Sequence, residues 1–235
     1  MLHKEIINRE LLELLTDLQK KPPLGHFSLG GGTALALHLG HRESTDIDLF
    51  TLRPILYDRL KRFLDESYRG QISYTSEGDD SDFIHSFVKN IKVDFLCYKQ
   101  VFVEEPKTIE GIRMLGLKDI GALKLRAIAD RRNKAKDFAD VYYLLKNNNI
   151  EEMFDWYKIK YGTKDITDVK KSLLSYNKVK PEDWDMVKYT NSTSPDEIKK
   201  TIYNHIQKYN QSHERIVNGR HHQDPPLVFH PPPGV

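Results

Sequence analysis

Residues 29–50 read LGGGTALALHLGHRESTDIDLF, and their pattern gives the clearest indication of the fold class. It predicts a short strand over 26–29, a turn at the glycines 30–32, a helix over 34–39 that Thr33 caps, and a second strand over 45–50. Apolar residues alternate with aspartates along the second strand, which is the periodicity of a β-strand. Two strands that alternate with a helix over so short a span favour a sheet mixed with helices.

The same stretch carries residues suited to phosphate and metal chemistry. Gly30 and Gly31 would let the backbone approach a ligand, and the amides of the helix that follows suit a phosphate. Asp46 and Asp48 are two residues apart on a strand, so their side chains leave the same face about 6–7 Å apart. Two such carboxylates repel each other unless a cation lies between them, and oxygen ligands of this kind suit Mg²⁺ or Mn²⁺.

A third acid, Asp94, lies in an apolar strand. Its burial there is costly unless the carboxylate binds a cation or accepts hydrogen bonds. Taken singly, each feature is more often structural: a flexible turn, a solvated strand face or a hydrogen-bonded acid. The ordered set of glycines, short helix, paired aspartates and later strand aspartate favours a catalytic site instead.

The rest of the chain predicts an α+β protein in two parts. An amphipathic helix over 3–20 ends at Pro22-Pro23, and Pro54 opens a helix that runs to Ser67. Strands are expected at 71–77, 82–89 and 91–98, with a hairpin turn at 78–81. Helices are expected at 117–132, 137–146, 150–160, 166–176 and 195–214. The expected division is a mixed-sheet catalytic domain over 1–105, a helical bundle over 106–217 and an extended or disordered tail over 218–235, where five prolines fall between 225 and 233.

Composition limits the class of protein. The 235 residues are 39% hydrophobic and 30% charged, and no run of about 18 apolar residues predicts a membrane span. Residues 1–5 lack an apolar signal core, and Cys97 is the only cysteine, which fits a reducing cytoplasm and no membrane partner. Residues 43–105 hold 13 acidic and 8 basic residues, whereas 107–147 hold 10 basic and 5 acidic. This change from an acidic to a basic segment reflects either ordinary variation of a solvated surface or a metal site that is followed by a phosphate-binding surface.

These residues also resemble a known family. The glycines, the Asp46-x-Asp48 pair and the lone strand residue Asp94 resemble the signature of the DNA polymerase beta-like nucleotidyltransferase superfamily. More closely, residues 29–50 resemble the AbiEii-type toxins, the nucleotidyltransferases of abortive-infection and type IV toxin–antitoxin systems. The downstream residues that resemble the family's helical motif are Lys118-Asp119, Lys124-x-x-Ala127, Arg131 and Lys136-Asp137-Phe138-x-Asp140.

The resemblance implies roles for individual residues. The implied catalytic set is Asp46, Asp48, Asp94, Lys124 and Asp137, and the first three would hold Mg²⁺ or Mn²⁺. The implied nucleotide-binding set is Gly30, Gly31, Thr33, Arg42, Lys118 and Arg131. Structural alternatives stay open for several of them. Thr33 could be a plain helix cap, and Arg42 could form a salt bridge. The basic helix face could simply be solvated, and Asp137 could stabilise the first turn of its helix.

The implied activity is transfer of a nucleoside monophosphate from an NTP to an RNA, such as a tRNA, or to a protein. The chain would then be a toxin with a possible cognate antitoxin as partner. A small-molecule acceptor, as in antibiotic nucleotidyltransferases, keeps the same chemistry. A non-catalytic nucleotide- or RNA-binding module is the alternative of another class, and the three acids argue against it because carboxylates without a metal weaken phosphate binding.

Overall fold

The computed structural model describes residues 1–75, 82–130 and 134–220, and for residues 215–220 it describes the backbone alone. The expected hairpin turn at 78–81, Arg131 and the tail from residue 221 onward lie outside the described residues.

A mixed seven-stranded sheet forms the first part of the described chain. Its strand order is β3-β4-β5-β2-β1-β7-β6, in which β2 pairs with β5, and β1 with β7, in parallel. The other neighbours pair antiparallel. The strands are β1 (Ser28–Leu29), β2 (Ile47–Thr51), β3 (Ile72–Tyr74), β4 (Phe83–Val88), β5 (Ile91–Cys97), β6 (Lys107–Ile109) and β7 (Ile112–Met114). The predicted mixed-sheet α+β fold is confirmed.

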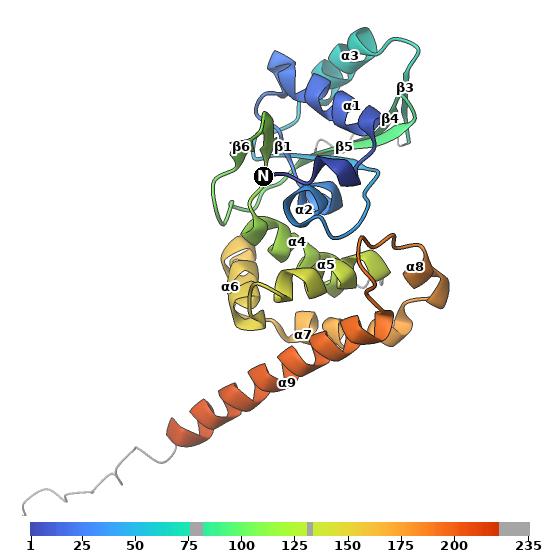
Figure 1. Ribbon diagram of the computed structural model, residues 1–235. Coiled ribbons are helices and arrows are strands. Elements are labelled where there is room, and N and C mark those ends of the chain that lie inside the picture. Colours follow the sequence, from blue (N-terminus) through green and yellow to red (C-terminus); the bar gives the residue numbers. More distant parts are fainter. Residues whose placement is uncertain (76–81, 131–133, 221–235) are drawn as a thin grey trace, which may run out of the picture.

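Helices cover the sheet and form the second part of the chain (Figure 1). Helices α1 to α3 lie with the sheet in the upper half of the view, and α4 to α9 form the lower half, where α9 extends away from the body. The helices are α1 (Arg9–Lys20), α2 (Gly31–Leu39), α3 (Tyr57–Ser67), α4 (Leu117–Ala129), α5 (Ala135–Leu145), α6 (Ile150–Tyr161), α7 (Thr167–Leu173), α8 (Pro181–Asp185) and α9 (Pro195–Arg220). None of those described is long and apolar enough to cross a membrane.

Two local expectations were wrong. The first helix is not continuous from residue 3, because the Asn8 side chain accepts a hydrogen bond from the Leu11 amide at 2.7 Å and starts α1 there. Thr33 does not cap the glycine helix. That helix begins at Gly31 after an extended Gly30, so Thr33 lies inside its first turn.

The short elements β6, β7 and α8 were not predicted. Each has only three to five residues, too few to show a periodicity in the sequence. The division at residue 105 stays a prediction, but the sheet continues beyond it to Met114. Sheet and helices share one core, in which Leu35 of α2, Ile120 of α4 and Phe138 of α5 belong to the same buried cluster. This shared core fixes the sheet against α4 and α5, where the candidate site lies.

Candidate active site

A cleft of about 630 Å³ opens between the sheet and helices α4 to α6. Its sheet side carries Asp46, Asp48 and Asp94, and its helix side carries Lys124 and Asp137. The structure therefore brings the five residues of the predicted catalytic set to one cavity, although Asp94 and Asp137 are 43 residues apart in the chain.

The register of the sheet places the acids. Asp48 of β2 lies directly beside Asp94 of the parallel strand β5, so the two side chains leave the same face of the sheet. Asp46 immediately precedes β2 and lies two residues before Asp48. Burial, followed by the charge of Asp94, raises the pKa of Asp48, and the nearby lysines only partly oppose this. The pair thus holds negative charge that the protein does not fully compensate.

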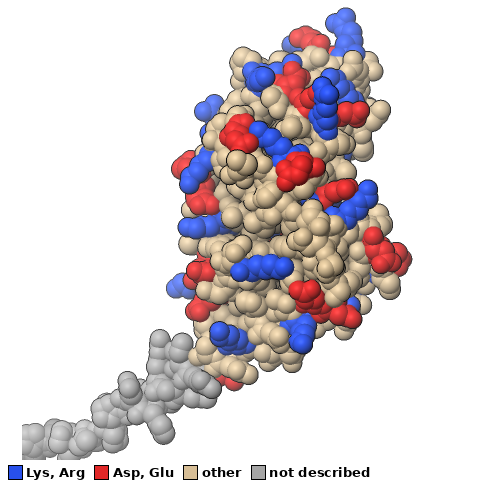
Figure 2. All heavy atoms as spheres, viewed as in Figure 1, with Lys and Arg blue, Asp and Glu red and all other residues tan. Residues whose placement is uncertain are grey.

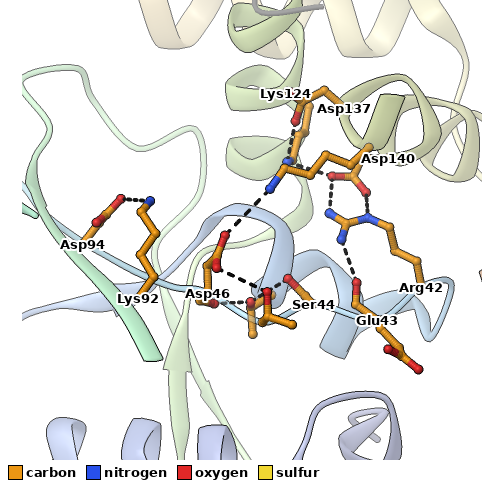
Figure 3. Close-up of polar contacts among 12 residues, drawn as sticks. Arg42, Glu43, Ser44, Asp46, Lys92, Asp94, Lys124, Asp137 and Asp140 are labelled. Carbon is orange, nitrogen blue, oxygen red and sulfur yellow. Dashed lines mark hydrogen bonds and ion pairs between the residues drawn. The ribbon is translucent and has the colours of Figure 1, made fainter. Parts of the chain in front are cut away.

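Asp94 already has a cationic neighbour. Its Oδ2 accepts a hydrogen bond from Lys92 Nζ at 2.6 Å, while His85 Nδ1 lies 3.0 Å from Oδ1 without the geometry of a hydrogen bond. Figure 3 shows the Asp94–Lys92 pair set apart from Asp46. Over the described ranges, no three His, Cys, Asp or Glu side chains are close enough together to hold a metal ion.

The glycines are needed for internal packing. Gly31 has a φ of +64°, and a Cβ atom on it would lie 1.9 Å from Asp48 Oδ2. A Cβ atom on Gly30 would lie 2.5 Å from the Phe50 ring. Gly31 and Gly32 line the cleft. The assignment of Gly30 and Gly31 to phosphate approach stays a prediction, and the structure adds that these glycines make room for β2 and the side chain of Asp48.

Thr33 and Arg42 support the cleft from behind. The buried Thr33 hydroxyl lies 2.8 Å from Ser44 Oγ and hydrogen-bonds the carbonyl of Asp46, which fixes the segment that leads into β2. Arg42 is 4% exposed and donates to both carboxylate oxygens of Asp140, at 2.7 and 2.9 Å. Arg42 therefore forms a salt bridge, which was the structural alternative to phosphate binding, and its partner is the buried Asp140.

Asp140 is the centre of a buried polar network that joins the glycine helix region to α4 and α5 (Figure 3). Lys124 Nζ lies 2.7 Å from Asp140 Oδ2 and 2.9 Å from Asp137 Oδ1. Burial would raise the pKa of Asp140, but the charges of Arg42 and Lys124 outweigh it and hold that pKa well below its usual value. Burial would also lower the pKa of Lys124, but Asp137 and Asp140 outweigh it and raise that pKa. Lys124 is therefore a fixed cation at the edge of the cleft.

Lys118 is not brought to this cleft. It lines a separate cavity of about 310 Å³ near Glu104, and its amide donates to Glu104 Oε1 at 3.3 Å. Arg131 lies outside the described residues, so its predicted role stays untested.

Several cleft residues were not among the predicted site residues. Lys92 lies two residues before Asp94 on one strand, and this spacing predicts a shared face, so the signal was present. At the other end of the cleft, the Tyr98 and Tyr161 hydroxyls lie 2.6 Å apart, and the Arg126 guanidinium lies 5.5 Å from the Tyr161 ring centroid. Tyr98 directly follows β5, Arg126 belongs to α4 and Tyr161 ends α6, so no local pattern in the sequence unites them.

Comparison with known proteins identifies the family of the chain. The family model for the nucleotidyl transferase AbiEii toxin of type IV toxin–antitoxin systems matches residues 13–211. An uncharacterized protein of Aquifex aeolicus (strain VF5) is 33% identical over 174 residues, which cover 70% of this chain and 82% of that protein. The chain belongs to the AbiEii family and is a nucleotidyltransferase.

Solved structures share the fold. A protein of H. pylori that is provisionally described as a nucleotidyltransferase is 19% identical, with a TM-score of 0.52, over 89% of this chain and 98% of that one. JHP933 of Helicobacter pylori is also 19% identical, with a TM-score of 0.50, over 92% of this chain and 99% of that one. At these identities the likeness extends to the fold alone.

Proposed function

We propose that this chain transfers a nucleoside monophosphate from an NTP to an RNA hydroxyl, and that Asp46, Asp48 and Asp94, which are not close enough together to hold a metal ion in this structure, turn their carboxylates toward a divalent cation when it binds. The observation that carries the proposal is the lateral pairing of Asp48 with Asp94, in register on parallel strands, at the base of the cleft. Asp94 is buried and Asp48 is half-buried, so their adjoining negative charges are costly to the fold, and a cation held by these residues would offset that cost.

The donor chemistry fits Mg²⁺ or Mn²⁺. All three side chains offer carboxylate oxygens, which these ions prefer. Burial, followed by the charge of Asp94, raises the pKa of Asp48, and a cation beside it would favour the carboxylate form. Asp94 would release Lys92, its present ion-pair partner, and bind the metal instead. When bound, the cation neutralises phosphate charge and polarises the bond that breaks.

The chain's own residues would orient the reactants. The acceptor oxygen bonds to the α-phosphorus of the NTP, the bond from that phosphorus to the α,β-bridging oxygen breaks, and pyrophosphate leaves with the electron pair. Asp94 takes the proton of the acceptor hydroxyl. Lys124, held by Asp137 and Asp140, supplies a fixed positive charge beside the phosphates.

The nucleobase would lie against Tyr98, Tyr161 and Arg126. Two tyrosine rings and a half-exposed guanidinium at one end of the cleft make a surface on which a base can stack.

A second groove supports an RNA acceptor. It has a volume of about 530 Å³ and adjoins the cleft at Asp46. Its lining includes Lys134, Lys136 and Lys188, the exposed Met186, and the acids Glu43 and Asp183. Lys134 and Lys136 line both cavities. Cations that continue from the cleft into a neighbouring groove suit a polyanionic acceptor better than a small neutral one. Figure 2 shows acidic and basic side chains intermingled on the face in view.

The test uses each α-labelled NTP with Mg²⁺ or Mn²⁺ and total bacterial tRNA. Wild type should label RNA, Asp48→Asn should not, and Asp185→Asn, which changes an exposed acid of α8, should match wild type. If a protein or an aminoglycoside became labelled and RNA did not, that molecule would be the acceptor in place of RNA. Nucleotide binding without any labelled product would contradict the transferase. A cytoplasmic toxin role and a cognate antitoxin form part of the same proposal, tested by growth arrest on expression and its relief by the neighbouring gene.

A further inference from the structure

A second polar cavity lies at the opposite end of β2 from the catalytic acids. Asp46 and Asp48 stand at the start of this strand, whereas Thr51 and Arg53, at its end, line a cavity of about 530 Å³. At about 3.3 Å per residue, Asp46 and Thr51 are roughly 16 Å apart along the strand. This cavity is therefore separate from the proposed catalytic cleft.

The titratable side chains that line this cavity are two arginines and a histidine. Arg53, Arg113 and His26 line it, and none of the described lining residues is Asp or Glu. Neither guanidinium forms an ion pair or a side-chain hydrogen bond with another residue of the described chain. Two guanidinium groups at one cavity repel each other unless an anion lies between them.

Arg113 is held in place without a partner for its side chain. Its amide donates to Gln19 Oε1 at 2.9 Å, and its carbonyl accepts from Gln19 Nε2 at 2.7 Å, so α1 fixes the backbone of β7 at this point. The Arg113 Nε atom is buried and has no hydrogen-bond partner. A buried donor without an acceptor is costly, and an anion at this position would satisfy it.

The neighbouring residues are consistent with a positive cavity. The Arg53 amide donates to Thr51 Oγ1 at 3.0 Å, which orders the chain directly after β2. Burial, followed by the charge of Arg53, lowers the pKa of His26, so this imidazole is neutral at pH 7 and leaves the positive charge to the two arginines.

We infer that the cavity between Arg53 and Arg113 binds a phosphate group. Guanidinium groups recognise phosphate through paired, charge-assisted hydrogen bonds, and the unpartnered Nε of Arg113 is one such donor. The phosphate is either that of an RNA backbone or a free phosphate. The inference does not depend on the proposed transferase activity, because none of these residues lines the catalytic cleft.

The test is a titration of the full-length, ¹⁵N-labelled protein with inorganic phosphate, and separately with decauridylate, at constant ionic strength. Amide signals of Leu52 and Arg53 and the Arg113 Nε–H signal report on this cavity, and those of Gly31 and Gly32 report separately on the catalytic cleft. Wild type should show saturable shifts at the first set, above all at Arg113 Nε–H. If decauridylate saturates the cavity at a lower concentration than inorganic phosphate does, RNA is the source of the phosphate group. If inorganic phosphate binds as tightly as decauridylate, the ligand is a free phosphate.

Three variants make the result decisive. Arg53→Gln/Arg113→Gln should raise the dissociation constant at this cavity about tenfold or more, and the exposed single variant Arg53→Gln should raise it in the same direction without risk to the fold. Arg59→Gln removes the same charge from the exposed face of α3 and should change nothing. Absence of saturable shifts in wild type, or an equal loss with Arg59→Gln, would overturn the inference.

Discussion

Gly31 and Asp48 are packed so closely that a single methyl group on the glycine would displace the acid, since its Cβ would lie 1.9 Å from Asp48 Oδ2. We therefore expect Gly31→Ala to reduce nucleotidyl transfer at least about 100-fold, because positioning errors of about 1 Å cost that much in rate. Steady-state transfer assays with saturating NTP would measure the loss.

The matched control is Gly111→Ala. Gly111 also has a positive φ, +86°, but nothing lies within 4 Å of its Cβ position. This variant should show only backbone strain, about 1–2 kcal/mol in urea unfolding, with normal activity. Equal activity losses in the two variants would mean that strain, and not the displaced acid, explains the Gly31 result.

Much of the acidic side of the site could be predicted from the sequence, because Asp48 and Asp94 lie on strands, whose period is two, and Asp46 directly precedes one of them. The adjacency of Asp46 and Asp48 follows from that period alone. Their meeting with Asp94 needs the pairing of β2 with β5, which the order of strands along the chain does not dictate. Arg42 shows the limit most clearly: a cation four residues before the aspartates fits phosphate binding, yet its partner is Asp140, 98 residues away. The tyrosine end of the cleft and the arginine cavity likewise come from separate elements.

Removal of Asp140 should destabilise the protein in a pH-dependent way. Asp140→Asn leaves Arg42 and Lys124 buried without their shared counterion, and such losses cost about 3–5 kcal/mol. Because the folded-state pKa of Asp140 lies well below its ordinary value of 3.8, this contribution is complete above pH 3.8 and is lost as the pH falls through the folded-state pKa. Urea unfolding at several pH values should show a constant difference between pH 5 and 7 that shrinks in acid.

The exposed variant Asp185→Asn serves as the comparison and should stay within about 0.5 kcal/mol of wild type. A difference between Asp140→Asn and wild type that grows in acid would contradict the assigned direction of the pKa shift.

A second buried pair, Lys160–Asp119, should behave as a coupled unit. Lys160 Nζ lies 2.6 Å from Asp119 Oδ1, and Asp119 also accepts from the amides of Val103 and Glu104. Asp119→Ala strands a buried ammonium and should cost about 3–5 kcal/mol. The double variant Asp119→Leu/Lys160→Met removes both charges, so it should be more stable than Asp119→Ala in urea unfolding. A double variant that is less stable than Asp119→Ala would show that the two residues act independently.

Tyr161 allows the base surface to be tested apart from phosphate binding. Tyr161→Ala should weaken NTP binding roughly 5- to 150-fold, because stacking of a base on an aromatic ring contributes about 1–3 kcal/mol. Tyr161→Phe keeps the ring and loses only the hydroxyl contact with Tyr98, so it should bind nearly as wild type does. Tripolyphosphate carries no base, so calorimetry should find its affinity the same in all three proteins. If Tyr161→Ala weakened tripolyphosphate as much as NTP, the tyrosine would be supporting the shape of the cleft, and the base would have to lie elsewhere.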